Sequence, residues 1–237
     1  GQAGGAAAAN ILYGKINPSG KLAETMPLKL SDNPSYLNFG GGEKVEYREG
    51  IFVGYRYYDT KEMDVAFPFG YGLSYTTFAY SNLKLSMENP TEKDTVMVSA
   101  DVTNTGKSAG KEVVQLYIRD LTGSAIRPEK ELKGFEKVFL EPGETKTVTM
   151  ELNKRSFAWY NTELHDWFAA SGDYEILVGA SSRDIRLTET LHLNSSQRLP
   201  MHVHMNTTLG ELLRHPKTKE TAKELTSKYL SAMNGGS

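Results

Sequence analysis

The strongest constraint on the fold is an alternation of apolar and polar residues in the middle of the chain. In the segment 96–103, every second residue is apolar: Val96, Val98, Ala100 and Val102. The pattern recurs at Val114, Leu116 and Ile118; at Val148, Met150 and Leu152; and at Tyr174, Ile176 and Val178. Because side chains in a strand point alternately to opposite faces, the pattern is typical of antiparallel strands with one buried face.

Turn-forming stretches separate these alternating segments, namely NTGKSAG, EPGE, ASGD and GASSRD. The alternating segments and the turns between them predict seven strands, at about 82–86, 95–103, 112–119, 130–140, 145–152, 172–180 and 185–193. A run of seven short strands indicates an immunoglobulin- or fibronectin III-like sandwich, so the fold class is mainly β. The segment SFAWYNTELHDWF, residues 156–168, breaks the alternation and is expected to cap one end of the sandwich.

The first 25 residues predict one helix and one strand. The helix is expected over Ala3–Tyr13, with Gly14 as its left-handed stop, and the strand over Leu22–Thr25 after the turn NPSG at 17–20. One helix and one strand cannot bury an apolar face by themselves. We therefore expect the chain to be a fragment that begins inside an incomplete α/β unit.

The segments that flank the sandwich have different compositions. Residues 27–75 are rich in Gly, Pro, Asn and aromatic residues and show little period, which is typical of a connecting segment that covers another surface. In the tail, Thr208 and Glu211 have capping-box spacing, and Pro216 suits the first turn of a second helix. That helix would carry a narrow apolar stripe of Ala222, Leu225 and Tyr229. The predicted domains are 1–75, 76–195 and a helical tail, 196–237.

Composition excludes several classes of function. The net charge is −2 over 237 residues, which gives no reason to expect a nucleic-acid or anionic-membrane partner. There is no cysteine, so thiolate catalysis and thiolate metal sites are excluded, and no cofactor is predicted. No apolar run approaches the roughly 20 residues that span a bilayer, and no leader is visible, which favours a cytoplasmic location.

The stretch EGIFVGYRYYDT, residues 49–60, allows two interpretations. In the first, Glu49 or Asp59 is a catalytic acid, and the rings of Tyr55, Tyr57 and Tyr58 are platforms for sugar. In the second, the rings fill the interface between two domains, and Arg56 pairs with Glu49 or Asp59. The residues alone do not exclude either interpretation.

Several blocks of the sequence together resemble the C-terminal region of family 3 glycoside hydrolases of the β-glucosidase type. They are GQAGGAAAANILYGKINPSGKLAETMP, YREGIFVGYRYYD, FPFGYGLSYTTF, VVQLYIRD, RPEKELKGFEKV and GDYEILVGASSRDIRL. The resemblance implies that residues 1–75 are the end of an α/β sandwich domain. It implies that residues 76–195 are a fibronectin III-like domain, which in that family follows an N-terminal barrel.

The same resemblance implies where the chemistry lies. Family members are retaining enzymes in which an aspartate on the barrel and a glutamate of the α/β domain stand about 5–5.5 Å apart. Both segments lie upstream of the GQAGG block, so no residue here inherits a catalytic role and the chain alone is expected to be inactive. The expected partners are the missing barrel and α/β portion, on the same or another chain, with self-association as an alternative. The residues assigned to the domain interface are Arg56, Tyr57, Tyr58, Phe67, Phe69 and Tyr71.

Other candidate sites are weaker. GQAGG lacks the spacing of a phosphate-binding loop and is better explained by helix packing. His202, His204 and His215 permit a metal site, but no carboxylate is in register with them. Trp159 and Trp167 are more typical of an apolar anchor than of a sugar-binding surface.

The segment ELHDW, residues 163–167, places His165 between Glu163 and Asp166, as in a charge-tuned base. No nucleophile accompanies the histidine, so a surface hydrogen-bonding role is favoured.

Two hypotheses of different class remain. The chain is either the accessory part of an exo-acting β-glucosidase or a stand-alone carbohydrate-binding or adhesion module. Within the enzyme hypothesis, glucosidase and xylosidase specificities remain open.

Overall fold

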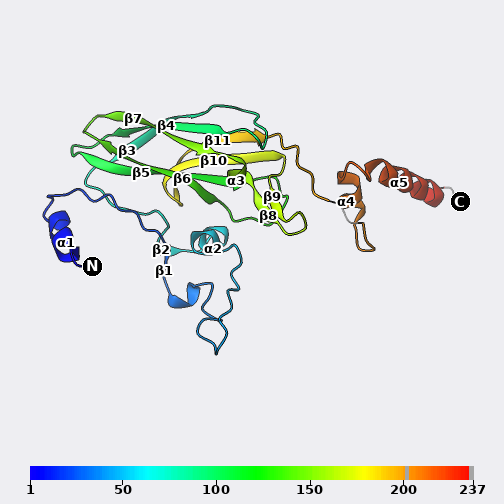
Figure 1. Cartoon of the computed structure of the whole chain (residues 1–237), viewed down its shortest axis with the longest axis horizontal. Helices are drawn as coiled ribbons and strands as arrows, with labels where there is room; N and C mark the ends of the chain where they lie inside the picture. Colours follow the sequence, from blue (N-terminus) through cyan, green and yellow to red (C-terminus); the bar gives the residue numbers. More distant parts are fainter. Residues whose placement is uncertain (201–202, 235–237) are drawn as a thin grey trace. The chain divides into compact units, whose positions relative to one another are not determined.

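The structure, a computed structural model, describes residues 1–200 and 203–234 (Figure 1). The chain divides into two compact units. The first comprises Gly1–Asn161 and Asp166–Gln197, and the second comprises Thr162–His165 and Arg198–Ser237. The first unit contains the sandwich and everything that precedes it.

Seven antiparallel strands form the two sheets of the sandwich. One sheet has the strand order β11-β10-β5-β6 and the other has the order β3-β4-β7. The strands are β3 (Phe78–Leu85), β4 (Val96–Asn104), β5 (Gly110–Asp120), β6 (Glu131–Leu140), β7 (Thr145–Leu152), β10 (Gly172–Ser181) and β11 (Asp184–Leu193). The predicted sandwich of seven strands is confirmed, with boundaries that shift by a few residues.

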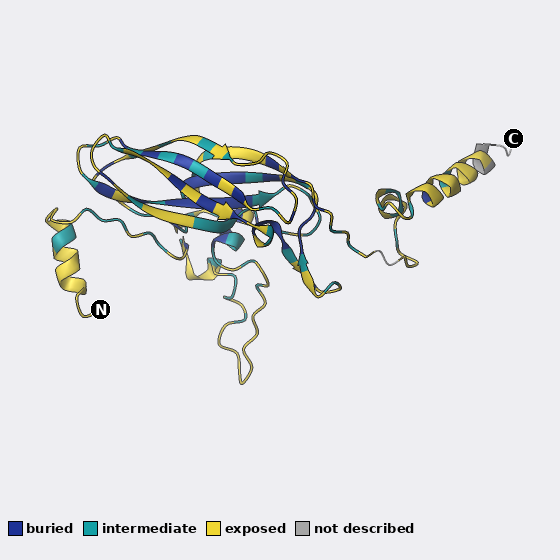
Figure 2. Cartoon of the chain, turned by 45° about the horizontal axis from the view of Figure 1, so that its top comes forward, coloured by how far each residue is buried: buried dark blue, intermediate teal, exposed yellow. Residues whose placement is uncertain are grey.

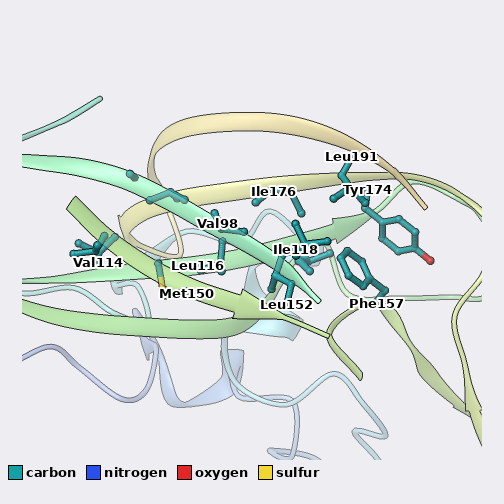
Figure 3. Packing of buried hydrophobic residues seen from close by; sticks show 14 of the residues in the cluster. Val98, Val114, Leu116, Ile118, Met150, Leu152, Phe157, Tyr174, Ile176 and Leu191 are labelled. Carbon is teal, nitrogen blue, oxygen red and sulfur yellow. The ribbon is translucent and has the colours of Figure 1, made fainter. Parts of the chain in front are cut away.

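The core lies between the two sheets and is built from the alternating residues (Figure 3). Every apolar residue that the alternation assigned to the inner face is at most 7% exposed. Along the strands, buried and exposed positions follow one another, as the colours in Figure 2 show. At one end of the core, the ring of Phe157 meets that of Tyr174 edge-on, with centroids 5.2 Å apart.

The segment that interrupts the alternation folds into a short helix and a hairpin. These are α3 (Lys154–Phe157), β8 (Trp159–Asn161) and β9 (Asp166–Phe168). The helix begins after Asn153, whose side chain accepts a hydrogen bond from the backbone amide of Arg155. Phe157 and Ala158 belong to the buried core, so this segment does close one end of the sandwich.

The first 75 residues contain only short elements. They are α1 (Gly4–Leu12), β1 (Met26–Pro27), the 3-10 turn η1 (Leu30–Asp32), α2 (Tyr55–Thr60) and β2 (Val65–Phe67). The first helix ends as predicted, with Gly14 at φ +69°. The predicted strand over Leu22–Thr25 is wrong. The strand here is β1, which pairs with β2. A strand exists only where a partner supplies hydrogen bonds, and that partner lies some forty residues away in the sequence.

The second unit contains α4 (Leu209–Arg214) and α5 (Lys219–Asn234). The predicted capping box is present, since the Thr208 hydroxyl accepts from the Glu211 amide and the Glu211 carboxylate accepts from the Thr208 amide. Pro216 lies in the turn before α5 rather than in its first turn. Within residues 1–200 and 203–234, no helix has the length and apolar character needed to cross a membrane.

Candidate functional site

The candidate stretch 49–60 contains helix α2, which packs against the sheet β11-β10-β5-β6. In Figure 1, α2 and the β1–β2 pair lie beside that sheet. The helix begins after Gly54, whose φ of +59° and ψ of −132° are accessible to glycine and strained for other residues. This conformation allows the chain to turn sharply into the helix and direct its first side chain at the sandwich.

Tyr55 is part of a buried aromatic cluster. Its ring stacks on Phe69 with centroids 4.6 Å apart and meets Tyr117 edge-on at 6.0 Å. Its hydroxyl accepts a hydrogen bond of 2.7 Å from the backbone amide of Leu132. Burial raises the pKa of the phenol. Because the ring is only 9% exposed, it has no free face on which a sugar could stack.

Asp59 is also buried by packing. Its carboxylate is nearly inaccessible and accepts a hydrogen bond of 2.7 Å from Nε of Arg183, which lies in the β10–β11 turn. The same guanidinium donates to the backbone carbonyls of Tyr58 and Met63, at 3.2 and 2.7 Å. Lys130 lies 3.6 Å from the other carboxylate oxygen. Arg183 therefore ties the C-terminal end of α2 to the sandwich, and the buried carboxylate of Asp59 is inaccessible to a substrate.

Arg56 pairs with a residue of the sandwich. Its guanidinium lies 3.3 Å from Glu131 on β6, so the predicted pairing with Glu49 or Asp59 is wrong. Glu131 also contacts Arg127 and lies 3.6 Å from Lys133. Burial acts to raise the pKa of Glu131, but the surrounding cations Lys133, Arg127 and Arg56 outweigh it and hold the pKa below its usual range.

The remaining aromatic residues assigned to the interface differ in exposure. Tyr58 is only 3% exposed, and its neighbour Tyr57 is half-buried and meets it edge-on at 5.4 Å. Phe67 is 43% exposed and packs on Tyr71 with centroids 5.1 Å apart. Tyr55, Tyr58 and Phe69 therefore lie on the packed side of the segment 54–71, whereas Phe67 is exposed.

Glu49 is the second acidic candidate of the stretch 49–60. It begins a turn that ends at Phe52, whose amide donates to the Glu49 carbonyl at 3.0 Å. Gly50 occupies that turn with φ +58°. Neither carboxylate oxygen of Glu49 has a hydrogen-bond partner in the described part of the chain, and Oε2 is shielded from solvent. The residue lines a cavity of about 360 Å³ together with Tyr57 and Lys61.

The two tryptophans lie in the hairpin that closes the sandwich. Trp159 meets Phe168 edge-on at 5.7 Å, and its indole nitrogen donates to Ser124 at 3.3 Å. One face of Trp167 is covered by the guanidinium of Arg155, 3.5 Å from the ring centroid. One face of Trp167 is therefore unavailable to a sugar, and Trp159 is anchored by Phe168 and Ser124.

The histidine candidates are dispersed. His165 lies in the turn between β8 and β9 with φ +49°. The Nδ1 atoms of His204 and His215 accept hydrogen bonds from backbone amides two residues further on, and His202 lies outside the described residues. Across 1–200 and 203–234, no group of three or more His, Cys, Asp or Glu residues could hold a metal ion. The glycine-rich start of the chain leads into α1, which has no buried residue.

Sequence reasoning did not single out Arg183, which makes three of the contacts that fix α2. Its partner Asp59 is 124 residues away in the sequence. The available signal was an arginine within the turn GASSRD, where a solvated role would ordinarily be assumed.

Two family profiles match the chain. "Glycosyl hydrolase family 3 C-terminal domain" matches residues 1–75, and "Fibronectin type III-like domain" matches residues 112–182. The chain belongs to glycoside hydrolase family 3. Both matches correspond to the C-terminal region of that family, in agreement with the sandwich and with the segment packed against it.

Relatives in family 3 are similar over most of this chain. Thermostable beta-glucosidase B of Acetivibrio thermocellus is 55% identical over 90% of the chain and 28% of its own length. An exo-alpha-(1->6)-L-arabinopyranosidase of Bifidobacterium breve is 48% identical over 81% of the chain and 25% of its own length. The chain thus spans little more than a quarter of these relatives.

Solved structures of family 3 enzymes show the same fold. A beta-glucosidase of Bifidobacterium adolescentis superposes with a TM-score of 0.83 at 43% identity, over 93% of this chain and 32% of that one. The beta-glucosidase of Kluyveromyces marxianus in complex with glucose gives 0.72 at 48% identity, over 78% and 22%.

Proposed function

We propose that this chain is the accessory C-terminal part of a retaining, exo-acting β-glucosidase and that its role is to position and stabilise the remainder of the enzyme. The observation that carries the proposal is the fixation of α2 by Arg183 and Asp59. A carboxylate that is buried between a guanidinium and a lysine serves packing, whereas a general acid must lie within hydrogen-bond reach of the substrate. The activity that this packing would support, hydrolysis of β-glucosides, is inferred from the names of the relatives.

The chain alone is expected to be inactive. A retaining glycosidase needs two carboxyl groups about 5–5.5 Å apart. Of the two acidic candidates in the stretch 49–60, Asp59 is bound to Arg183, and no second carboxylate is among the described residues that line the cavity beside Glu49. The catalytic pair would then come from the portion of the enzyme that the relatives possess and this chain does not span.

The surface for that portion is supplied by the first 53 residues. Apolar side chains there are exposed to an extent that an isolated domain does not favour. Those that are at least 59% exposed are Leu12, Tyr13, Leu28, Leu30, Leu37, Phe39, Val45, Tyr47 and Val53. Their burial would stabilise a complex with the barrel and α/β portion, and in its absence they would favour self-association.

The names of the relatives suggest two substrate classes. Most of those cited are β-glucosidases, which favours terminal β-D-glucosides. The arabinopyranosidase at 48% identity makes terminal α-L-arabinopyranosides the second candidate. Because both relatives possess a region similar to this chain, similarity to the chain does not by itself choose between the two classes.

Reconstitution tests the proposal. The chain would be mixed with the N-terminal portion of the Acetivibrio enzyme, and hydrolysis of p-nitrophenyl β-D-glucopyranoside and p-nitrophenyl α-L-arabinopyranoside would be followed. We expect neither half to act alone and the mixture to hydrolyse the glucoside. Turnover by the purified chain alone, abolished by Glu49→Gln, would contradict the proposal. So would an N-terminal half whose activity and stability do not change when the chain is added.

A further inference from the structure

We propose that the cavity beside Glu49 is an accessory binding site for a single pyranose ring. The inference deepens the proposed function, on which the choice of sugar rests. Its residues are contributed by the segment 48–52, by α2 with the residue that follows it, and by Pro34.

The size of the cavity suits a small ligand. Its volume of about 360 Å³ lies at the lower end of the range of about 300–1,000 Å³ that is typical of ligand sites. It is lined by Arg48, Glu49, Phe52, Tyr57, Thr60 and Lys61, together with one proline. Two aromatic rings beside several polar groups match a pyranose, which has apolar C–H faces and a rim of hydroxyl groups.

Glu49 supplies an unused acceptor. Oε2 is shielded from solvent and unpartnered, so the carboxylate bears a desolvation cost that no hydrogen bond inside the described chain offsets. Oε1 is left as the oxygen that can accept from a ligand. Vicinal hydroxyl groups of a sugar are suitable donors because charge-assisted hydrogen bonds to a carboxylate are stronger than neutral ones.

Lys61 supplies the complementary donor. Its ammonium lies 5.6 Å from the ring centroid of Tyr57, which lines the same cavity, and no ion pair involves Lys61 within residues 1–200 and 203–234. Arg48, by contrast, is already bound to Glu46. The cavity therefore offers one free negative and one free positive group, a balance that favours a neutral polyhydroxylated ligand over an ion.

One side of the cavity is formed by helix α2, whose position is fixed by contacts with the sandwich. Tyr57 and Thr60 belong to α2, which Arg183 and Asp59 hold against the sandwich. The Thr60 hydroxyl donates to the Arg56 carbonyl and accepts from the Glu129 amide. A ligand that bridged Glu49 and Lys61 would thus connect the loop 48–52 to a helix whose position is already fixed.

Binding to the chain itself tests the site. Backbone amide NMR shifts of residues 48–61 would be followed during titration with D-glucose and cellobiose, and sorbitol would serve as an acyclic polyol control. We expect saturable shifts for the two sugars in the millimolar range, centred on Thr60 and Lys61, and none for sorbitol. Absence of saturation, or equal shifts with sorbitol, would overturn the proposal.

Matched variants locate the site. Glu49→Gln and Tyr57→Ala should each raise the dissociation constant at least fivefold, because each removes a principal contact. Glu43→Gln and Tyr47→Ala make the same chemical changes at exposed positions of the same segment outside the cavity and should leave binding unchanged. Thermal unfolding of each variant verifies that it is folded. Unaltered binding in both Glu49→Gln and Tyr57→Ala would refute the site.

The result is independent of reconstitution. If the chain restores activity to the N-terminal half but binds no sugar alone, the proposed function stands and the accessory site fails. If it binds sugar through Glu49 but restores no activity, the site stands and the proposed function fails.

Discussion

The sandwich and the first 53 residues contain similar apolar side chains with opposite fates. In the sandwich, residues such as Val98, Leu116 and Ile176 are completely buried. Among residues 1–53, only Thr25 is buried, and Leu37 is 95% exposed. The difference lies in the second layer, because an apolar face becomes a core only when another element covers it. Two sheets cover one another in the sandwich, whereas within the described part of the first unit no second layer covers the early segment.

Hydrogen exchange should show the contrast most strongly. Amides of β4, β5, β7 and β10 are expected to exchange only through global unfolding, which for a domain costs about 5–15 kcal/mol. Amides of α1 should exchange almost as fast as in a free peptide, since an isolated nine-residue helix is marginal in water. Exchange of the monomeric chain would be followed by mass spectrometry. Uniform protection along the chain would contradict the difference between the sandwich and the first 53 residues.

A truncation inside the core should have the next largest effect. Leu116→Ala removes a fully buried side chain and should lower the free energy of unfolding by about 2–5 kcal/mol. Leu37→Ala makes the same change at an exposed position and should alter it by less than about 0.5 kcal/mol. Urea unfolding measures both, and equal losses would show that the early segment has a core of its own.

Removal of the carboxylate that holds α2 should have a smaller effect. Asp59→Ala leaves the Arg183 guanidinium without its acidic partner, but Arg183 is partly exposed and can be hydrated. We expect a loss of about 1–3 kcal/mol and faster exchange of the α2 amides. Asp64→Ala, at a nearby exposed position, is the control. Unchanged exchange in α2 would show that Arg183 does not fix the helix.

The cations around Glu131 should make stability depend on pH in the acid range. The folded-state pKa is lowered, so its contribution is present above the unfolded value of about 4.3 and is lost as the pH falls through the folded value. Glu131→Gln should therefore flatten the loss of stability below about pH 4.3, measured by urea unfolding at successive pH values. Glu136→Gln, at an exposed position on the same strand, should keep the steeper loss. Identical acid profiles for the two variants would contradict this account.

The smallest effect is expected for Arg56. Its side chain is about one-third exposed, so Arg56→Ala should lower stability by no more than about 1 kcal/mol. In the reconstituted enzyme the Michaelis constant should stay the same. A large rise in that constant at unchanged melting temperature would instead place the segment in contact with the substrate.

The periodic part of the fold was predictable from sequence, and the long-range pairing was not. The alternation at Val96–Val102 depends on one strand alone and is visible within the eight residues 96–103. The pairings of Arg56 with Glu131 and of Asp59 with Arg183 depend on where the β6 strand and the β10–β11 turn come to lie. Charged side chains in a connecting segment do not specify their partners, so the sequence showed the residues of the candidate site without their contacts.

The contacts of Arg183 have a consequence for protein engineering. Residues 54–63 and the sandwich form one mechanical piece, although a connecting segment separates them in the sequence. A chimera joined at residue 76 would take Asp59 from one parent and Arg183 from the other. A chimera joined before Gly54 would transfer helix, turn and sandwich together. The exchangeable module of this chain therefore starts some twenty residues ahead of its first sandwich strand.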